Sequence, residues 1–171
     1  DRKIAQAFDL KANNERFIVC LNHWKAKDNS YNKPDEYADT GDGQGSHVLR
    51  RVHEAEATLE FIKTVTAYFE DEDVLIVGDL NSYSKEDPIR VLEEGELINE
   101  LQKYAPNEYS YAFFSNNSYA TGYLDHSFAT ATLDAQIRYA HPFHINADEP
   151  DALKIGGKPQ EDNMYRCSDH N

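Results

Sequence analysis

The most constraining feature of the sequence is a long amphipathic segment between two short apolar runs. From His47 to about Glu70, apolar residues recur at steps of three and four, the spacing of an amphipathic helix. The β-favouring run 17–21 lies before this segment, and the continuous apolar run 74–77 follows it. The second run predicts a strand that is covered on both faces. This strand, helix, strand order indicates an α/β or α+β layered domain.

Weaker signals extend the expected fold towards the C-terminus. Asp87 followed by Pro88 predicts a helix N-cap and a first helical position, with an interruption near Gly95. A second short helix is expected through Leu97, Ile98 and Leu101, ending before Pro106. The remaining expected elements are two paired strands at 109–114 and 123–130, a further strand at 135–139, and loops at 27–46 and 146–163.

The bulk properties indicate one domain and argue against general attraction to polyanions. A chain of 171 residues is long enough for one core and short for two, so 1–171 is expected to form a single domain. With 17 Lys and Arg against 31 Asp and Glu, the net charge of −14 repels nucleic acid and anionic lipid. A phosphate-ester substrate would therefore need a bound cation to attract it.

Neither a membrane-spanning segment nor a leader is recognisable in the sequence. No apolar run approaches the roughly 18 residues that cross a bilayer, so a soluble chain is expected. The chain opens without an initiating Met and closes on Ser168–Asn171, and we therefore expect it to be part of a longer protein.

The two cysteines, Cys20 and Cys167, lack the CxxC spacing of a zinc knuckle. Two buried free thiols are the favoured interpretation, because free cysteine is commonly buried. One disulfide between them is the alternative.

Asp79 and Asn81 follow the second apolar run. Two residues apart at the end of a strand, they are expected to point to the same side while Leu80 turns inward. A carboxylate beside an amide suits a hard cation and a phosphate oxygen. Taken alone, an ordinary turn explains these residue types equally well.

Three further stretches carry groups that suit phosphoryl chemistry. Asp169 and His170 put a metal ligand next to a proton acceptor, although a terminal pair of this kind is more often a solvated tail. Asp125 lies among strand-forming residues, and a histidine would be its natural partner, since a carboxylate fixes the tautomer of an imidazole. His23, at a strand end, suits donation to a phosphate oxygen, but a lone histidine is usually structural.

The glycine-rich stretch Gly41–Gly45 invites comparison with a phosphate-binding loop. It lacks the Lys-Ser/Thr ending of a P-loop and follows no strand, so a surface loop is expected.

Taken together, four stretches resemble the successive signatures of the endonuclease/exonuclease/phosphatase superfamily. In chain order they are Asn22–Lys25, Gly78–Asn81, Tyr123–His126 and Ser168–His170. Two narrower features resemble the branch of secreted bacterial nucleases rather than inositol phosphatases or sphingomyelinases. They are Gly41–Gly45 leading into the helix with Arg51, and the stretch His144–Pro150.

The resemblance implies a deoxyribonuclease-I-like fold, a four-layer β-sandwich of two sheets flanked by helices. By this comparison the chain is the C-terminal two-thirds of the domain and is N-terminally incomplete, because the family's first sheet carries an Asn and a metal-binding Glu that nothing before Phe17 matches. Ser46 stands where several members of the secreted branch have a cysteine. The same branch implies a protein that is secreted or in the cell envelope of a bacterium.

The resemblance also implies a divalent-metal-dependent phosphodiester hydrolase, with a nuclease acting on DNA or RNA favoured. The implied reaction is in-line attack of an activated water, with Mg²⁺, Mn²⁺ or Ca²⁺ polarising the phosphate. A phosphatase or phosphodiesterase acting on inositol phosphates or sphingomyelin is the alternative. A non-catalytic binding domain, or a fragment without activity, is the alternative from another class, and no protein partner is inferred.

Each candidate residue receives a role from the resemblance. Asp79, Asn81 and Asp169 are implied to engage the metal, and Asn81 the scissile phosphate as well. His23 and Asn22 are implied to contact the substrate phosphate. His170 is implied to be the general base or acid, oriented by Asp125.

Overall fold

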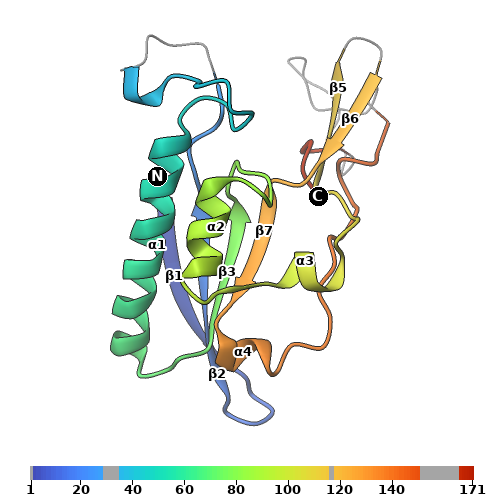
Figure 1. Cartoon of the computed structure of the whole chain (residues 1–171). Helices are drawn as coiled ribbons and strands as arrows, with labels where there is room; N and C mark the ends of the chain where they lie inside the picture. Colours follow the sequence, from blue (N-terminus) through green and yellow to red (C-terminus); the bar gives the residue numbers. More distant parts are fainter. Residues whose placement is uncertain (1, 29–34, 116–117, 151–165) are drawn as a thin grey trace.

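The computed structural model describes residues 2–28, 35–115, 118–150 and 166–171. These residues form a five-stranded sheet, helices that lie across one face of it, and a separate two-stranded hairpin (Figure 1). In chain order the elements are β1 (Arg2–Asp9), β2 (Arg16–His23), the 3-10 helix η1 (Asp35–Tyr37), α1 (Val48–Phe69), β3 (Val74–Asp79), α2 (Asp87–Glu94), β4 (Ile98–Asn99), α3 (Glu100–Tyr104), β5 (Tyr111–Ser115), β6 (Ser118–Gly122), β7 (Asp125–Ala129) and α4 (Ala131–Asp134).

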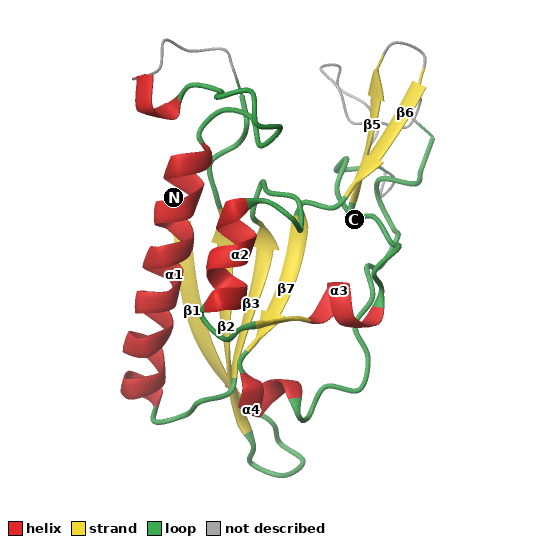
Figure 2. Ribbon diagram, in the orientation of Figure 1, coloured by secondary structure: helices red, strands yellow, loops and turns green. Residues whose placement is uncertain are grey.

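The main sheet has the strand order β1-β2-β3-β7-β4. Strands β2 and β3 are parallel, while β1 with β2, β3 with β7 and β4 with β7 pair antiparallel. Helices α1 and α2 lie side by side over one face of this sheet (Figure 2). Because β2 and β3 run in the same direction, both deliver their C-terminal residues to the same edge of the sheet.

The amphipathic pattern of the sequence accounts for the long helix and its orientation. Helix α1 begins directly after His47 and ends at Phe69, as predicted. Its buried residues recur at steps of one, three and four, so they form a stripe along one side of the helix. They are Arg51, Glu54, Ala55, Thr58, Ile62 and Val65. This stripe packs with α2 and with the inward side chains of β2 and β3 to form the core.

The sheet has one well-covered face and one that is much more exposed. Val74 and Ile76 are fully buried under the helices, whereas Leu75 and Val77 on the other face are only half-buried. On the same face Leu21 of β2 is 50% exposed. The expectation that 74–77 is covered on both faces is therefore wrong for the described residues, because a continuous apolar run does not reveal which layers are present. The structure confirms the α/β class. Of the four layers that were expected, the described residues form one large sheet and one helical layer.

The structure corrects two predictions in the middle of the chain. Glu86, rather than Asp87, is the N-cap of α2, so the helix starts one residue earlier than expected. Leu97 and Ile98 are not helical, since Ile98 belongs to strand β4, and the second helix covers only Glu100–Tyr104. Apolar residues at helical spacing are too few here to separate a short strand from a short helix.

The strand pairing predicted for 109–114 and 123–130 is also wrong. Strand β5 pairs with β6, a strand that was not predicted, while β7 pairs with β3 and β4 inside the main sheet. The strand expected at 135–139 is absent, because a turn at 135–136 directly follows α4 and residues 137–139 have no regular secondary structure. The loop expected at 146–163 is confirmed for 146–150, and its remainder lies outside the described residues.

The two cysteines are not bonded to each other. Cys20 is buried in the core, as predicted, and burial raises the pKa of its thiol to about 11. Cys167 is exposed, contrary to the expectation of two buried thiols, and its Sγ lies 2.8 Å from Asn146 Oδ1. None of the helices in the described ranges is both long enough and apolar enough to span a bilayer.

Candidate functional site

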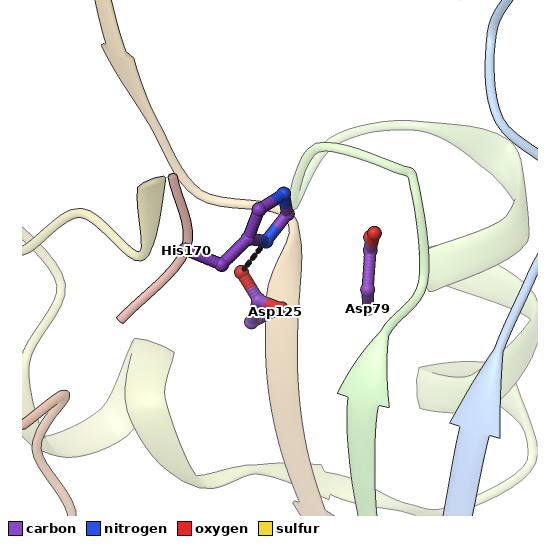
Figure 3. Close-up of side chains that lie close together, drawn as sticks. All are labelled: Asp79, Asp125 and His170. Carbon is purple, nitrogen blue, oxygen red and sulfur yellow. Dashed lines mark hydrogen bonds and ion pairs between the residues drawn. The ribbon is translucent and has the colours of Figure 1, made fainter. Parts of the chain in front are cut away.

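Asp79, Asp125 and His170 converge at one edge of the sheet, although they are far apart in the sequence (Figure 3). One ligand atom from each residue lies within 4.8 Å of the other two. Their side chains are 21%, 25% and 29% exposed, so all three reach solvent from a mostly buried position. The four weak sequence signals therefore include three that the fold brings together.

The register of three neighbouring strands places the acidic residues. His23 of β2 is paired with Asp79 of β3, and Asp79 is paired with Asp125 of β7. Residues paired in this way point to the same face of a sheet. These three side chains therefore form a row on the face opposite α1 and α2, at the C-terminal end of β3.

Gly78 allows the backbone of β3 to lie against β2 just before Asp79. Its φ is +134°, and an added Cβ would lie 1.9 Å from the carbonyl oxygen of Asn22. No other residue could occupy this position without moving one of the two strands. The glycine in the Gly-Asp-x-Asn stretch thus has a packing role at the edge of the site.

Asp79 is held by its own turn and is left with one oxygen facing the site. Its Oδ1 accepts the backbone N–H of Asn81 at 2.8 Å, while its Oδ2 lies 3.7 Å from His23 Nε2. Burial raises the pKa of Asp79, and the nearby carboxylate of Asp125 raises it further. A positive charge beside these two carboxylates would relieve both effects.

His170 is fixed by the backbone as well as by its side chain. Residue 170 forms an isolated β-bridge with Tyr111, and the Ala112 N–H donates to the Asp169 carbonyl at 3.0 Å. The His170 Nδ1 lies 2.7 Å from Asp125 Oδ2, and this hydrogen bond raises the pKa of the histidine. The segment is therefore not the solvated tail that a terminal Asp-His pair usually forms. The second ring nitrogen, Nε2, points away from Asp125.

Two of the residues chosen from the sequence, Asn22 and Asn81, are buried away from this cluster. Asn22 is 2% exposed and lies under α1, where its Oδ1 is 3.4 Å from the hydroxyl of Thr58. Asn81 is also buried, and its amide donates to the Trp24 carbonyl at 3.1 Å. Since β3 ends at Asp79, strand alternation does not apply to Asn81, whose φ is +49°. Leu80 turns inward as predicted and is fully buried.

Asp169 and His23 lie beside the cluster without joining it. Asp169 is half-buried, and the group of three does not include its carboxylate. His23 is 71% exposed in its side chain, and its Nε2 lies 3.7 Å from Asp79 Oδ2. The structure thus brings His23 to the rim of the site and leaves its ring accessible.

Three residues to which the sequence assigned no role in the site support it from behind. Ser110 donates to Asp125 Oδ2 at 2.7 Å, and His126 is 2% exposed with its Nε2 2.7 Å from the Ser82 carbonyl. Arg51, which is fully buried, donates to the carbonyl oxygens of Ser46 and Gln44, and so fixes the end of the Gly41–Gly45 loop. A serine between two tyrosines carries no recognisable pattern, so nothing in the sequence pointed to Ser110.

The donor set of the cluster fits a divalent cation. Asp79 and Asp125 offer carboxylate oxygens and His170 offers an imidazole nitrogen, all from side chains that are partly shielded from water. Oxygen ligands suit Mg²⁺ and Ca²⁺, and a mixed oxygen and nitrogen set suits Mn²⁺.

Comparison with known proteins shows the fold. No protein-family model matches the chain, and neither does a curated protein. Among solved structures, the human Nocturnin catalytic domain with bound sulfate anion matches with a TM-score of 0.51 and 16% identity, over 75% of this chain and 41% of that one. A mannosyl-6-phosphatase of Bacteroides thetaiotaomicron matches with a TM-score of 0.52 and 18% identity, over 76% and 43%. An endonuclease/exonuclease/phosphatase family protein of the same bacterium matches with a TM-score of 0.52 and 18% identity, over 75% and 41%.

These likenesses confirm the fold expected from the four sequence signatures. The described residues share the deoxyribonuclease-I-like fold of these solved structures, one of which is an endonuclease/exonuclease/phosphatase family protein. It spans about two fifths of the length of the solved structures that it matches.

Proposed function

We propose that the chain is part of a divalent-metal-dependent phosphoester hydrolase that acts at Asp79, Asp125 and His170. The observation that carries this proposal is the meeting of two carboxylates and an imidazole at one sheet edge, from three distant parts of the chain. A cluster that only stabilised the fold would not need a histidine that is hydrogen-bonded to one carboxylate and lies near a second. A metal-dependent hydrolase, in contrast, needs both a cation site and an oriented base.

Asp79 and Asp125 are the residues that we expect to hold the metal, together with Asp169, the neighbour of His170. When bound, the cation would polarise the phosphate and balance the charge that develops on its oxygens. It would also supply the attraction that a protein with a net charge of −14 lacks.

The imidazole of His170 is arranged to accept a proton. Because Nδ1 is engaged by Asp125, the proton of the neutral ring lies on Nδ1 and the lone pair lies on Nε2. Asp125 then stabilises the imidazolium that forms when Nε2 takes a proton from the attacking water. The exposed ring of His23, next to Asp79, is placed to donate to a phosphate oxygen.

A phosphodiester in DNA or RNA is the substrate that we propose first, on the basis of the loop features that resemble secreted nucleases. A phosphomonoester is the second candidate, because one of the matching structures is a mannosyl-6-phosphatase. Plasmid DNA and RNA, compared with mannose 6-phosphate, inositol phosphates and sphingomyelin, would separate the two in one set of assays.

The experiment uses the full-length protein with Mg²⁺ and a His170→Gln variant. Loss of a general base is expected to lower turnover by a hundredfold or more. His53→Gln is the matched control, since His53 is exposed on α1 away from the cluster, and it should leave turnover unchanged. Turnover that survives in His170→Gln would remove His170 from the reaction. Hydrolysis that continues undiminished in excess EDTA would remove the metal.

A further inference from the structure

Ser110 hydrogen-bonds Asp125 and the residue that directly follows His170. It is 2% exposed and lies directly before β5. Its hydroxyl is 2.7 Å from Asp125 Oδ2, the same oxygen that lies 2.7 Å from His170 Nδ1. One carboxylate oxygen is therefore held from two sides, by the serine and by the histidine.

The direction of the Ser110 hydroxyl proton follows from its other contacts. The backbone N–H groups of Leu124 and Asp125 each lie 3.0 Å from Ser110 Oγ, and a backbone N–H can only donate. These two donors occupy the acceptor positions of the hydroxyl, which has a single proton left to give. That proton points to Asp125 Oδ2. The hydroxyl cannot rotate away without leaving these two partly buried N–H groups unsatisfied.

The backbone of Ser110 holds the histidine segment in the same way. Its carbonyl accepts the N–H of Asn171, which directly follows His170, at 2.8 Å. Asn171 is in turn anchored through its side chain, whose Oδ1 accepts the N–H groups of Asn146 and Ala147 at 3.2 and 2.9 Å. One buried residue thus fixes the carboxylate through its side chain and the imidazole through its main chain.

We propose that Ser110 is a positioning residue that completes a Ser110, Asp125, His170 relay of hydrogen bonds and holds the pair in the geometry for proton transfer. The effect of Ser110 on catalysis depends on the proposed function, whereas the hydrogen bonds of the relay are a property of the fold. With the serine proton directed at one side of Oδ2, the remaining lone pair of that oxygen faces Nδ1. Asp125 therefore keeps one orientation, and His170 keeps Nε2 aimed at the site.

The test compares Ser110→Ala with the conservative Ser110→Thr in the full-length protein. A hydrogen bond to a charged group contributes enough that its loss should lower kcat by roughly ten- to hundredfold. KM should change by less than about twofold, because the serine does not touch the substrate. Ser110→Thr keeps the hydroxyl and should recover most of the lost turnover. Thr130→Val is the matched control, since it removes a hydroxyl that bonds the backbone at the opposite end of β7.

A second measurement follows the relay without needing turnover. The Nδ1–H proton of His170, in a short hydrogen bond to a carboxylate, should resonate far downfield in the proton NMR spectrum. We expect this signal to shift upfield and broaden in Ser110→Ala, and to remain in Ser110→Thr and Thr130→Val. If Ser110→Ala does not fold, the isosteric pair Ser110→Thr and Ser110→Val makes the same comparison.

Two outcomes would overturn the proposal. One is an unchanged downfield signal and unchanged kcat in Ser110→Ala. The other is an equal loss in Ser110→Ala, Ser110→Thr and Thr130→Val, which would show only a role in stability. Absence of hydrolysis in the unmodified protein would contradict the proposed function alone, since the NMR signal would still report on the relay.

Discussion

His126 should make the stability of the protein depend steeply on pH below neutrality. The ring is 2% exposed, its Nε2 lies 2.7 Å from the carbonyl of Ser82, and its Nδ1 lies 3.4 Å from the side-chain amide of Asn99. A carbonyl can only accept, so this network assigns the proton to Nε2 and leaves Nδ1 as an acceptor. Burial lowers the pKa of His126 to about 4.

The expected loss of stability follows from the difference in proton affinity between the two states. In the unfolded chain a histidine has a pKa near 6.5, so below that pH the unfolded state binds a proton while the folded His126 ring stays neutral. The stabilising contribution is complete near neutrality, falls as the pH drops through the window from about 6.5 to about 4, and then levels off. Since each tenfold difference in affinity corresponds to about 1.4 kcal/mol, the loss is about 3 kcal/mol.

Urea unfolding at a series of pH values, for the unmodified protein and His126→Gln, would measure this loss. Other titrating groups act in both proteins and cancel in the difference, whereas glutamine does not titrate. We expect the stability advantage of the histidine protein over the variant to shrink by about 3 kcal/mol between about pH 7 and pH 4. Two curves that run parallel through this window would refute the argument that the ring is buried and neutral.

Two further predictions concern packing behind the site. Gly78→Ala should lower the free energy of unfolding, measured by chemical denaturation, by several kcal/mol, because its Cβ would overlap the Asn22 carbonyl. Gly43 also has a positive φ, but an added Cβ there would meet nothing within 4 Å, so Gly43→Ala should lower it by only about 1 kcal/mol. Equal losses would contradict the packing role of Gly78. Arg51→Met should lower the free energy of unfolding by about 3 kcal/mol, because it leaves carbonyl oxygens in the protein interior without their donor. Its melting temperature should therefore fall far more than that of Arg50→Met. Similar melting temperatures for the two variants would count against this role of Arg51.

The parts of the fold that could be predicted from sequence are those with long or strongly periodic patterns. Helix α1 and strands β2 and β3 were expected nearly where they lie, because amphipathic spacing and continuous apolar runs persist over enough residues. The pairing of β7 was not, since Tyr123–Thr130 suits either a hairpin or the main sheet equally well. Its place beside β3 depends on long-range packing that local propensity does not encode.

Site residues could be predicted where a polar or charged residue type is unusual for its place in the sequence. Residues that belong to the site only through three-dimensional contacts could not be predicted. Carboxylates at the ends of two strands and an imidazole beside an aspartate were recognisable, and Asp79, Asp125 and His170 do meet. Asn22 carried the same kind of signal yet lies under the helix, because adjacent strand residues point to opposite faces. Ser110 carried no signal, since its importance comes from contacts made across the fold.

The central claim is that Asp79 and Asp125 hold a cation beside His170, and anomalous diffraction from crystals of the protein soaked in Mn²⁺ tests it most directly. We predict one strong anomalous peak within coordination distance of Asp79, which is lost in Asp79→Asn and retained in the surface variant Asp39→Asn. A peak elsewhere on the acidic surface, or a peak beside Asp79 that survives Asp79→Asn, would contradict the claim.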